Sequence, residues 1–157
     1  MLRTPRLTLA VAESVTCGHL QAAIGAISGA SEFFLGGLTA YTITQKVRHL
    51  GVDRATAEAV NAVSPAIAEQ MARGAAAYFG SDLALATTGY AEAAPALDAT
   101  QPVAYWALAH RRPDNTWVQR QGREDWPGAA RVAMQQAVAD AAMAGLLRYL
   151  REWRGSG

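Results

Sequence analysis

The chain opens with a short apolar run that is followed at once by polar residues. Residues 7–12 are apolar apart from one threonine and have the length of a strand. The polar residues 13–18 then lead into a segment, 20–27, in which apolar residues recur every three or four positions. Gly29 closes this segment, as glycine commonly does at the end of a helix. The pattern predicts a strand, a polar turn and a helix.

The next part of the chain predicts one strand and two helices. Gly36-Gly37 interrupts the apolar pattern before a strand over 38–41. Apolar residues at helical spacing then predict a short helix over 43–50. Ser64 precedes a proline, which is the usual start of a helix, and a helical pattern continues over 65–78.

The remaining pattern completes an α/β arrangement. Strands that alternate with helices are typical of a sheet covered on both faces, and a late hairpin adds antiparallel pairing. We therefore expect an α/β fold, a three-layer α/β/α sandwich around a mixed, mostly parallel sheet. The elements predicted here are a strand over 83–88, a loop over 90–101, a hairpin over 103–110 and 117–121, a helix over 129–151 and a frayed tail from Arg154.

Polar motifs follow three of the predicted strands, at residues 14–18, 41–46 and 88–89. In sheets of this kind, ligands bind beyond the carboxyl ends of the strands. We expect the three motifs to converge on one edge of the sheet.

Composition narrows the class of partner. The 157 residues suit one domain over 1–157, with 51% hydrophobic residues and a net charge of +1, which gives no footprint for nucleic acid. A single cysteine, Cys17, excludes an internal disulfide, and the three scattered histidines predict no metal site. The N-terminal strand pattern is too short for a signal peptide or a membrane span, so we expect a cytoplasmic protein with a small-molecule partner. The alanine-rich C-terminal helix could support a homo-oligomer.

Lys46 is the only lysine, beside thirteen arginines. A lysine amine can become a neutral base when it is desolvated, whereas arginine keeps its proton. At about 100° per residue, Lys46 lies roughly 60° from the middle of the apolar stripe of its helix, so a half-buried amine is expected. Tyr41 ends the preceding strand, and its phenol could face the same cleft. The alternative is that Lys46 is an ordinary solvated charge.

Several motifs, taken together, resemble the CinA C-terminal domain family of competence/damage-inducible proteins, the nicotinamide-nucleotide amidohydrolases. The resemblance covers most of the chain, from Leu7 to about Arg148. The matching motifs are residues 12–18 (similar to A-E-S-C-T-G-G), 29–37 (similar to G-S-S-x-x-F-x-G-G), the Tyr41 to Lys46 spacing (Y-x-x-x-x-K), 50–52 (L-G-V), 62–64 (within G-A-V-S) and Thr88-Gly89 (the start of T-G-I-A-G-P).

This resemblance implies hydrolysis of the carboxamide of nicotinamide mononucleotide to nicotinic acid mononucleotide and ammonia, without a metal or organic cofactor. It places Ser14, Tyr41, Lys46 and Thr88 at active-site positions. The residue types are compatible with Ser14 as nucleophile, Lys46 as its base and Tyr41 as a proton relay or donor.

Substrate binding is assigned to the two loops that follow the first and third strands. Backbone amides of the turn at Thr16, Cys17 and Gly18 could hold a phosphate or a developing oxyanion, and Thr88 and Gly89 could contact the substrate. The competing interpretation is structural: Ser14 and Thr16 could be plain helix caps, and Thr88 could merely end its strand.

Two departures from the family pattern bear on phosphate binding. Cys17 stands where the family has glycine, although we expect it to fill space rather than to catalyse. After Gly89 the family's glycines are replaced by residues 90–96, in which Glu92 would repel a phosphate if it faces the site. Tyr105 adds bulk where the family has P-V-G-T.

Two hypotheses follow from these departures. One is an active amidohydrolase with an altered, less phosphorylated substrate. The other is a catalytically degenerate relative that binds a ligand or a partner. A short-chain dehydrogenase, which also uses Ser, Tyr and Lys, fits poorly because the glycine-rich dinucleotide turn is absent after residues 7–12.

Overall fold

One mixed five-stranded sheet forms the centre of the protein. The structure, a computed structural model, describes residue 2 and residues 6–155. The strand order is β2-β1-β3-β4-β5; the pairings of β1 with β2 and β3 are parallel, and those of β4 with β3 and β5 are antiparallel. The predicted mixed sheet is confirmed, with β4 running against the other four strands. The strands are β1 (Leu9–Glu13), β2 (Phe34–Thr39), β3 (Leu83–Tyr90), β4 (Val103–Arg111) and β5 (Trp117–Asp125).

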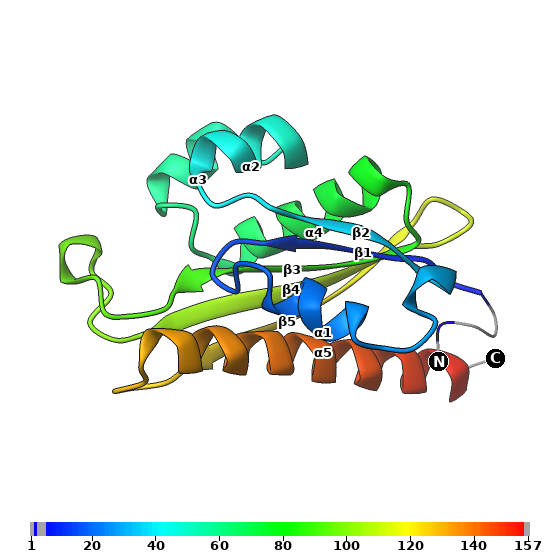
Figure 1. Cartoon of the computed structure of the whole chain (residues 1–157). Coiled ribbons are helices and arrows are strands. Elements are labelled where there is room, and N and C mark those ends of the chain that lie inside the picture. Colours follow the sequence, from blue (N-terminus) through cyan, green and yellow to red (C-terminus); the bar gives the residue numbers. More distant parts are fainter. Residues whose placement is uncertain (1, 3–5, 156–157) are drawn as a thin grey trace.

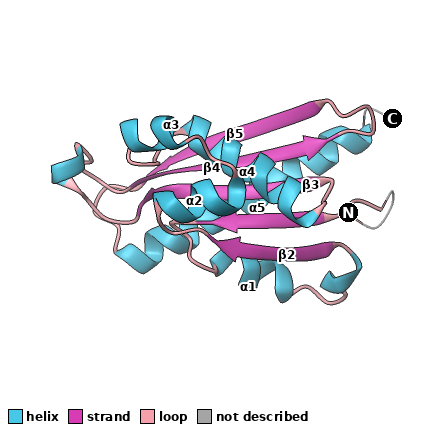
Figure 2. Cartoon of the chain, turned by 90° about the horizontal axis from the view of Figure 1, so that it is seen from above, coloured by secondary structure: helices cyan, strands magenta, loops and turns pink. Residues whose placement is uncertain are grey.

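Helices cover both faces of the sheet, as the alternating pattern predicts. Figure 1 shows α1 (His19–Gly25) and the long α5 (Arg131–Gly155) on one face. The opposite face carries α2 (Ile43–Leu50), α3 (Arg54–Ala59) and α4 (Pro65–Phe79). Figure 2, from above, shows the strands side by side beneath this second group of helices. The short 3-10 helices η1 (Ala30–Glu32) and η2 (Pro95–Leu97) lie in connecting loops.

The two faces of the sheet differ in side-chain size. In β3, Leu83 and Leu85 belong to the core under α5, while Ala84 and Ala86 belong to the core under α4. Successive residues of a strand point to opposite faces, so the alternation of leucine and alanine produces one bulky and one flat face. α4 also contributes mainly alanines to its core, and two such surfaces can pack with their backbones close together.

This close packing extends from α4 to the helix that carries Lys46. A Cβ on Gly74, in the middle of α4, would collide with the main-chain carbonyl of Leu50, the last residue of α2. Lys46 lies one helical turn before Leu50. The glycine therefore lets α2 lie against α4, and this contact fixes where Lys46 stands relative to the sheet.

Three details differ from the sequence-based expectation. Gly36 and Gly37 lie within β2 rather than before a strand. Glycine is needed at position 37 because a Cβ there would collide with Val11 of β1 and Gln21 of α1. Helix α3 was not predicted. α5 continues to Gly155, so Arg154 is helical and only the end of the expected tail, residues 156–157, lies outside the described residues.

Candidate active site

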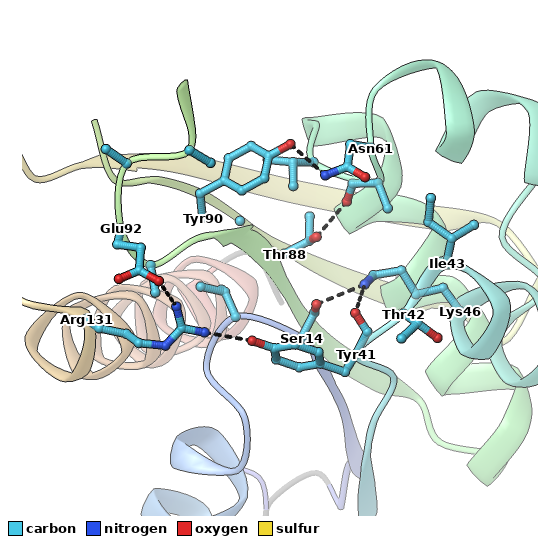
Figure 3. Close-up of a pocket in the computed structure, with 17 residues that line it drawn as sticks. Ser14, Tyr41, Thr42, Ile43, Lys46, Asn61, Thr88, Tyr90, Glu92 and Arg131 are labelled. Atoms are coloured by element: carbon cyan, nitrogen blue, oxygen red, sulfur yellow. Dashed lines mark hydrogen bonds and ion pairs between the residues drawn. The ribbon is translucent and has the colours of Figure 1, made fainter. Parts of the chain in front are cut away.

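A pocket of about 410 Å³ lies at the carboxyl ends of the parallel strands. Ser14 directly follows β1, Tyr41 follows β2, and Thr88 and Gly89 lie near the end of β3. Figure 3 shows Ser14, Tyr41 and Thr88 around one cavity, with Lys46 on one side and Arg131 on the other. The complete lining is Ser14, Val15, Tyr41, Thr42, Ile43, Lys46, Asn61, Ala62, Val63, Thr88, Gly89, Tyr90, Ala91, Glu92, Ala93, Ala94 and Arg131.

Lys46 and Ser14 form a buried pair at the base of this pocket. Lys46 Nζ donates a hydrogen bond of 2.9 Å to Ser14 Oγ and a second, of 3.2 Å, to the backbone carbonyl of Tyr41. Lys46 is only 2% exposed, so the amine is more deeply buried than the half-buried position expected from the sequence. Both oxygens that accept from the amine are neutral.

Burial in this setting lowers the pKa of Lys46 from its ordinary value of 10.5 to about 8. Desolvation disfavours the charged ammonium, and neither of the two oxygens that it contacts brings a compensating negative charge. A sizeable fraction of the amine is therefore neutral near pH 7–8. A neutral amine 2.9 Å from a serine hydroxyl can accept the hydroxyl proton.

Local structure explains why the amine points at Ser14. Thr42 caps the N-terminus of α2 by accepting from Gln45 N, and Gly51 ends the helix in the left-handed conformation with φ 63°. Ala40 N, just after β2, donates to the carbonyl of Glu13 at the end of β1. The ends of two neighbouring strands are thus held together, and α2 begins three residues beyond Ala40.

The phenol of Tyr41, which the sequence predicts as a proton relay or donor, lies beside Arg131. The Tyr41 side chain lines the pocket but is 51% exposed, and the phenol oxygen accepts a 2.8 Å bond from Arg131 Nη2. The atom of Tyr41 that contacts Lys46 is the backbone carbonyl. The phenol is therefore positioned at the pocket mouth, toward the start of α5.

The turn that follows Ser14 is not an open anion cradle. Gly18 N at 2.9 Å and Leu20 N at 3.1 Å donate to Glu13 Oε2, and Gln21 N at 2.9 Å donates to Oε1. Thr16 Oγ1 adds a 2.6 Å bond to the same carboxylate. Glu13 is fully buried. Its carboxylate thus takes the place that the sequence interpretation gave to a phosphate or an oxyanion.

Three of the expected substrate-binding residues consequently lie outside the pocket lining. Thr16 is fully buried and also shares a 2.7 Å hydrogen bond with Thr87 of β3. Gly18 adopts φ 106° at the start of α1, and its amide donates to the Glu13 carboxylate. Cys17 is exposed, with φ 45°. The Thr16 hydroxyl and the Gly18 amide both bind the Glu13 carboxylate and so help to order the turn behind Ser14.

Thr88 and Gly89 do line the pocket. Thr88 Oγ1 donates 2.6 Å to the carbonyl of Ala62, so the hydroxyl ties β3 to the loop after α3. A Cβ on Gly89 would collide with Ala104 of β4. Tyr105, expected to add bulk here, is absent from the lining of this pocket; the Arg123 guanidinium lies over its ring at 5.8 Å from the centroid.

Arg131 and Asn61 also line the pocket and are not among the site residues predicted from the sequence. Arg131, the first residue of α5, bonds to Glu92 at 2.6 Å and to Tyr41. Asn61 Nδ2 donates to the hydroxyl of Tyr90 at 3.0 Å and so joins the loop after α3 to the end of β3. Asn61 has φ 47°, a left-handed conformation that asparagine tolerates. A single asparagine in the sequence does not indicate that the residue lines a pocket.

Stability should depend on pH through Lys46. The pKa of the folded protein, about 8, lies below the ordinary value of 10.5, so between these values the unfolded chain binds more protons and stability rises with pH. We expect the free energy of unfolding to rise by on the order of 3 kcal/mol across this window. Urea denaturation of wild type and Lys46→Met at pH 7 and pH 10 measures the effect. Methionine has no proton to lose, so the free energy of unfolding of the variant should lack the rise with pH that Lys46 causes. An equal change of this free energy between pH 7 and pH 10 in the two proteins would contradict the prediction.

Two features are absent from the part of the chain that the structure describes. Residues 2 and 6–155 contain no group of three or more His, Cys, Asp or Glu side chains arranged to hold a metal ion. None of the helices in this part of the chain is both long enough and apolar enough to cross a membrane.

Comparison with known proteins identifies the family. Residues 1–150 match the family model described as the CinA C-terminal domain. A CinA-like protein of Picosynechococcus sp. is 43% identical over 115 residues, which are 73% of this chain and 27% of that protein. A CinA-like protein of Synechococcus sp. is 41% identical over 131 residues, covering 80% of this chain and 31% of the relative. The chain thus spans about a quarter to a third of the length of these relatives.

Solved structures agree with this assignment. The crystal structure of competence damage-inducible protein A from Klebsiella pneumoniae superposes with a TM-score of 0.87 at 27% identity, over 97% of this chain and 91% of that one. A CinA superfamily protein from Escherichia coli superposes with a TM-score of 0.84 at 26% identity, over 94% and 83% of the two chains. From the match of residues 1–150 and from these relatives, the chain belongs to the CinA C-terminal domain family.

Proposed function

We propose that the protein is an amidohydrolase that cleaves the carboxamide of a nicotinamide nucleotide or a related amide, with Ser14 as nucleophile and Lys46 as base. The observation that carries the proposal is the 2.9 Å bond between Lys46 Nζ and Ser14 Oγ, with the amine 2% exposed and its pKa lowered to about 8. A nucleophile needs an adjacent base, and a desolvated lysine is one of the groups that supplies it.

The first half of the reaction forms an ester. Ser14 Oγ attacks the carboxamide carbon while its proton passes to Lys46 Nζ. The C–N bond then breaks, and the Lys46 ammonium returns a proton to the departing nitrogen, which leaves as ammonia. The acyl group stays on Ser14. Because the amine ends this step neutral, it can act as a base a second time.

The second half consumes water. A water molecule attacks the ester carbon and gives a proton to Lys46, and the Ser14 oxygen leaves and takes a proton back from the same amine. The products are the free carboxylic acid and the resting enzyme. One amide and one water thus yield one acid and one ammonia, and no cofactor enters the balance.

Substrate placement is assigned to the other lining residues. Thr88 and Gly89 form the part of the wall contributed by β3, and Tyr41 and Asn61 lie on neighbouring loops. A pocket of about 410 Å³ falls within the range of small-molecule sites, roughly 300–1,000 Å³. Its size therefore supports a nucleoside- or nucleotide-sized amide.

The test is ammonia release from nicotinamide mononucleotide and nicotinamide riboside by the purified protein. Ser14→Ala, purified in parallel, is the blank for contaminating amidases, and Ser31→Ala, at an exposed position outside the lining, is the matched control. The proposal expects ammonia and the corresponding acid in equal amounts from at least one substrate with wild type and Ser31→Ala. Ammonia from neither substrate would contradict it and favour the alternative, a non-catalytic ligand-binding protein.

A further inference from the structure

The pocket mouth carries an ion pair whose position bears on which substrates can enter. Glu92, in the loop after β3, and Arg131, the first residue of α5, are 39 positions apart in sequence and meet at 2.6 Å between Oε1 and Nη1. Arg131 Nη2 also donates 2.8 Å to the Tyr41 phenol. Figure 3 shows this chain of three side chains across the pocket from Lys46. All three line the cavity.

This ion pair contributes little to the stability of the fold. The Arg131 side chain is 45% exposed and the Glu92 side chain is 64% exposed. Exposed ion pairs of this kind are screened by water and salt. Its effect on a charged ligand is larger, because the ligand would bind directly beside it. The carboxylate balances the guanidinium that would otherwise be the permanent cation of this pocket wall.

The charges of the lining are few. Glu92 is its only carboxylate, and Arg131 and Lys46 are its only basic residues. Lys46 lies at the base beside Ser14, and its pKa of about 8 leaves part of the population neutral. A phosphate that enters must therefore displace Glu92 from Arg131 or bind beside an ion pair that carries no net positive charge. Either event disfavours a dianion and leaves a neutral ligand unaffected.

The turn after Ser14 and the first turn of α1 already bind a carboxylate of the protein itself. The amides of Gly18, Leu20 and Gln21 donate to the buried side chain of Glu13. The loop over residues 90–94, in which Glu92 lies, contains no glycine that would let backbone amides surround an anion.

We propose that the Glu92–Arg131 ion pair makes this pocket selective for carboxamides without a phosphate group, such as a nucleoside, over the corresponding nucleotides. The selectivity rests on the proposed amidohydrolase function and narrows its substrate class. Glu92 acts as a specificity residue. It takes no part in the bond-breaking steps, and it pairs with the Arg131 guanidinium that a phosphate would need.

The test compares kcat/KM for nicotinamide riboside and nicotinamide mononucleotide in wild type, Glu92→Gln and Glu152→Gln. The control residue, Glu152, pairs with Arg120 at 3.9 Å and lies on the same helix as Arg131, 21 residues further on, about 30 Å along its axis. Wild type is expected to prefer the riboside. Glu92→Gln should shift the ratio toward the mononucleotide by about tenfold or more, whereas Glu152→Gln should leave the ratio at the wild-type value.

A wild-type preference for the mononucleotide, or a ratio that Glu92→Gln does not change, would overturn the proposal. Failure of the proposed function is distinguished by titrating both compounds calorimetrically into Ser14→Ala and Ser14→Ala/Glu92→Gln. If neither compound is hydrolysed by wild type, tighter binding of the riboside to Ser14→Ala and a shift toward the mononucleotide in the double variant still support the selectivity. Equal binding of the two compounds, or no binding of either, would overturn it.

Discussion

Replacement of Lys46 by arginine is expected to lower kcat/KM for amide hydrolysis by at least about a thousandfold. Arginine keeps a positive charge but does not give up its proton, so the variant retains the charge and loses the base. The effect should appear in kcat, since the proton from Ser14 Oγ has to be accepted in the transition state. Initial rates of ammonia release measured at saturating and at low substrate separate kcat from KM.

Two further proteins control for the bulk and position of the change. Arg48→Lys exchanges the same two residue types at an exposed site on the same helix, and its activity should match wild type. Lys46→Met removes the amine and should be as inactive as Lys46→Arg. We expect it to be at least as stable as wild type at pH 7. Retention of more than about a tenth of the activity in a folded Lys46→Arg or Lys46→Met protein would remove lysine from the mechanism.

Glu13→Ala is expected to destabilise the protein by about 4 kcal/mol or more, the second large effect. The carboxylate is fully buried and accepts from three backbone amides and the Thr16 hydroxyl. Alanine would leave the three amides without this acceptor, whereas the Thr16 hydroxyl would keep its bond to Thr87. Each unsatisfied group costs about 1–3 kcal/mol. Urea denaturation of wild type and variant gives the difference in the free energy of unfolding.

The free energy of unfolding of Glu13→Gln should lie between those of wild type and Glu13→Ala. The single oxygen of the glutamine can serve the donors that Oε2 serves, but its amide nitrogen would face Gln21 N, which now donates to Oε1. Glu58→Ala is the control for loss of a carboxylate, because Glu58 is exposed and pairs only with Arg54 of the same helix turn at 3.3 Å. A loss below about 1 kcal/mol in Glu13→Ala would show that the turn behind Ser14 does not depend on this carboxylate.

The order of the elements follows from local pattern. Ser64 and Pro65 mark the start of α4 as the cap and first residue of a helix do elsewhere, and Gly80 ends it in the left-handed conformation with φ 68°. The apolar run over residues 83–88 predicts β3 equally well. These signals depend on residues within a few positions of one another, which is why a single sequence carries them.

The details that sequence reasoning missed depend on contacts between distant residues. Gly36 and Gly37 look like a break, but the space taken by Val11 and Gln21 makes glycine necessary inside β2. The Glu92–Arg131 pair joins residues 39 positions apart. No local pattern reports either contact.

The polar turn after β1 misled for a related physical reason. A run of small and polar residues before a helix is typical of an anion site, because helix N-terminal amides lack partners of their own. Here the partner is provided within the same motif by Glu13, whose side chain turns back into the interior and binds those amides. The sequence indicated that the amides need a negative charge and left open whether the charge belongs to the protein or to a ligand.

The proposed mechanism requires Lys46 to be a base rather than a permanent cation. Because Lys46 is the only lysine, protein labelled with isotopic lysine gives a single side-chain resonance in nuclear magnetic resonance spectra, and its shift can be followed across pH. The mechanism predicts a titration with a pKa of about 8. A titration at the ordinary value of 10.5 would show a fully charged amine at neutral pH and would contradict the assignment of Lys46 as the base for Ser14.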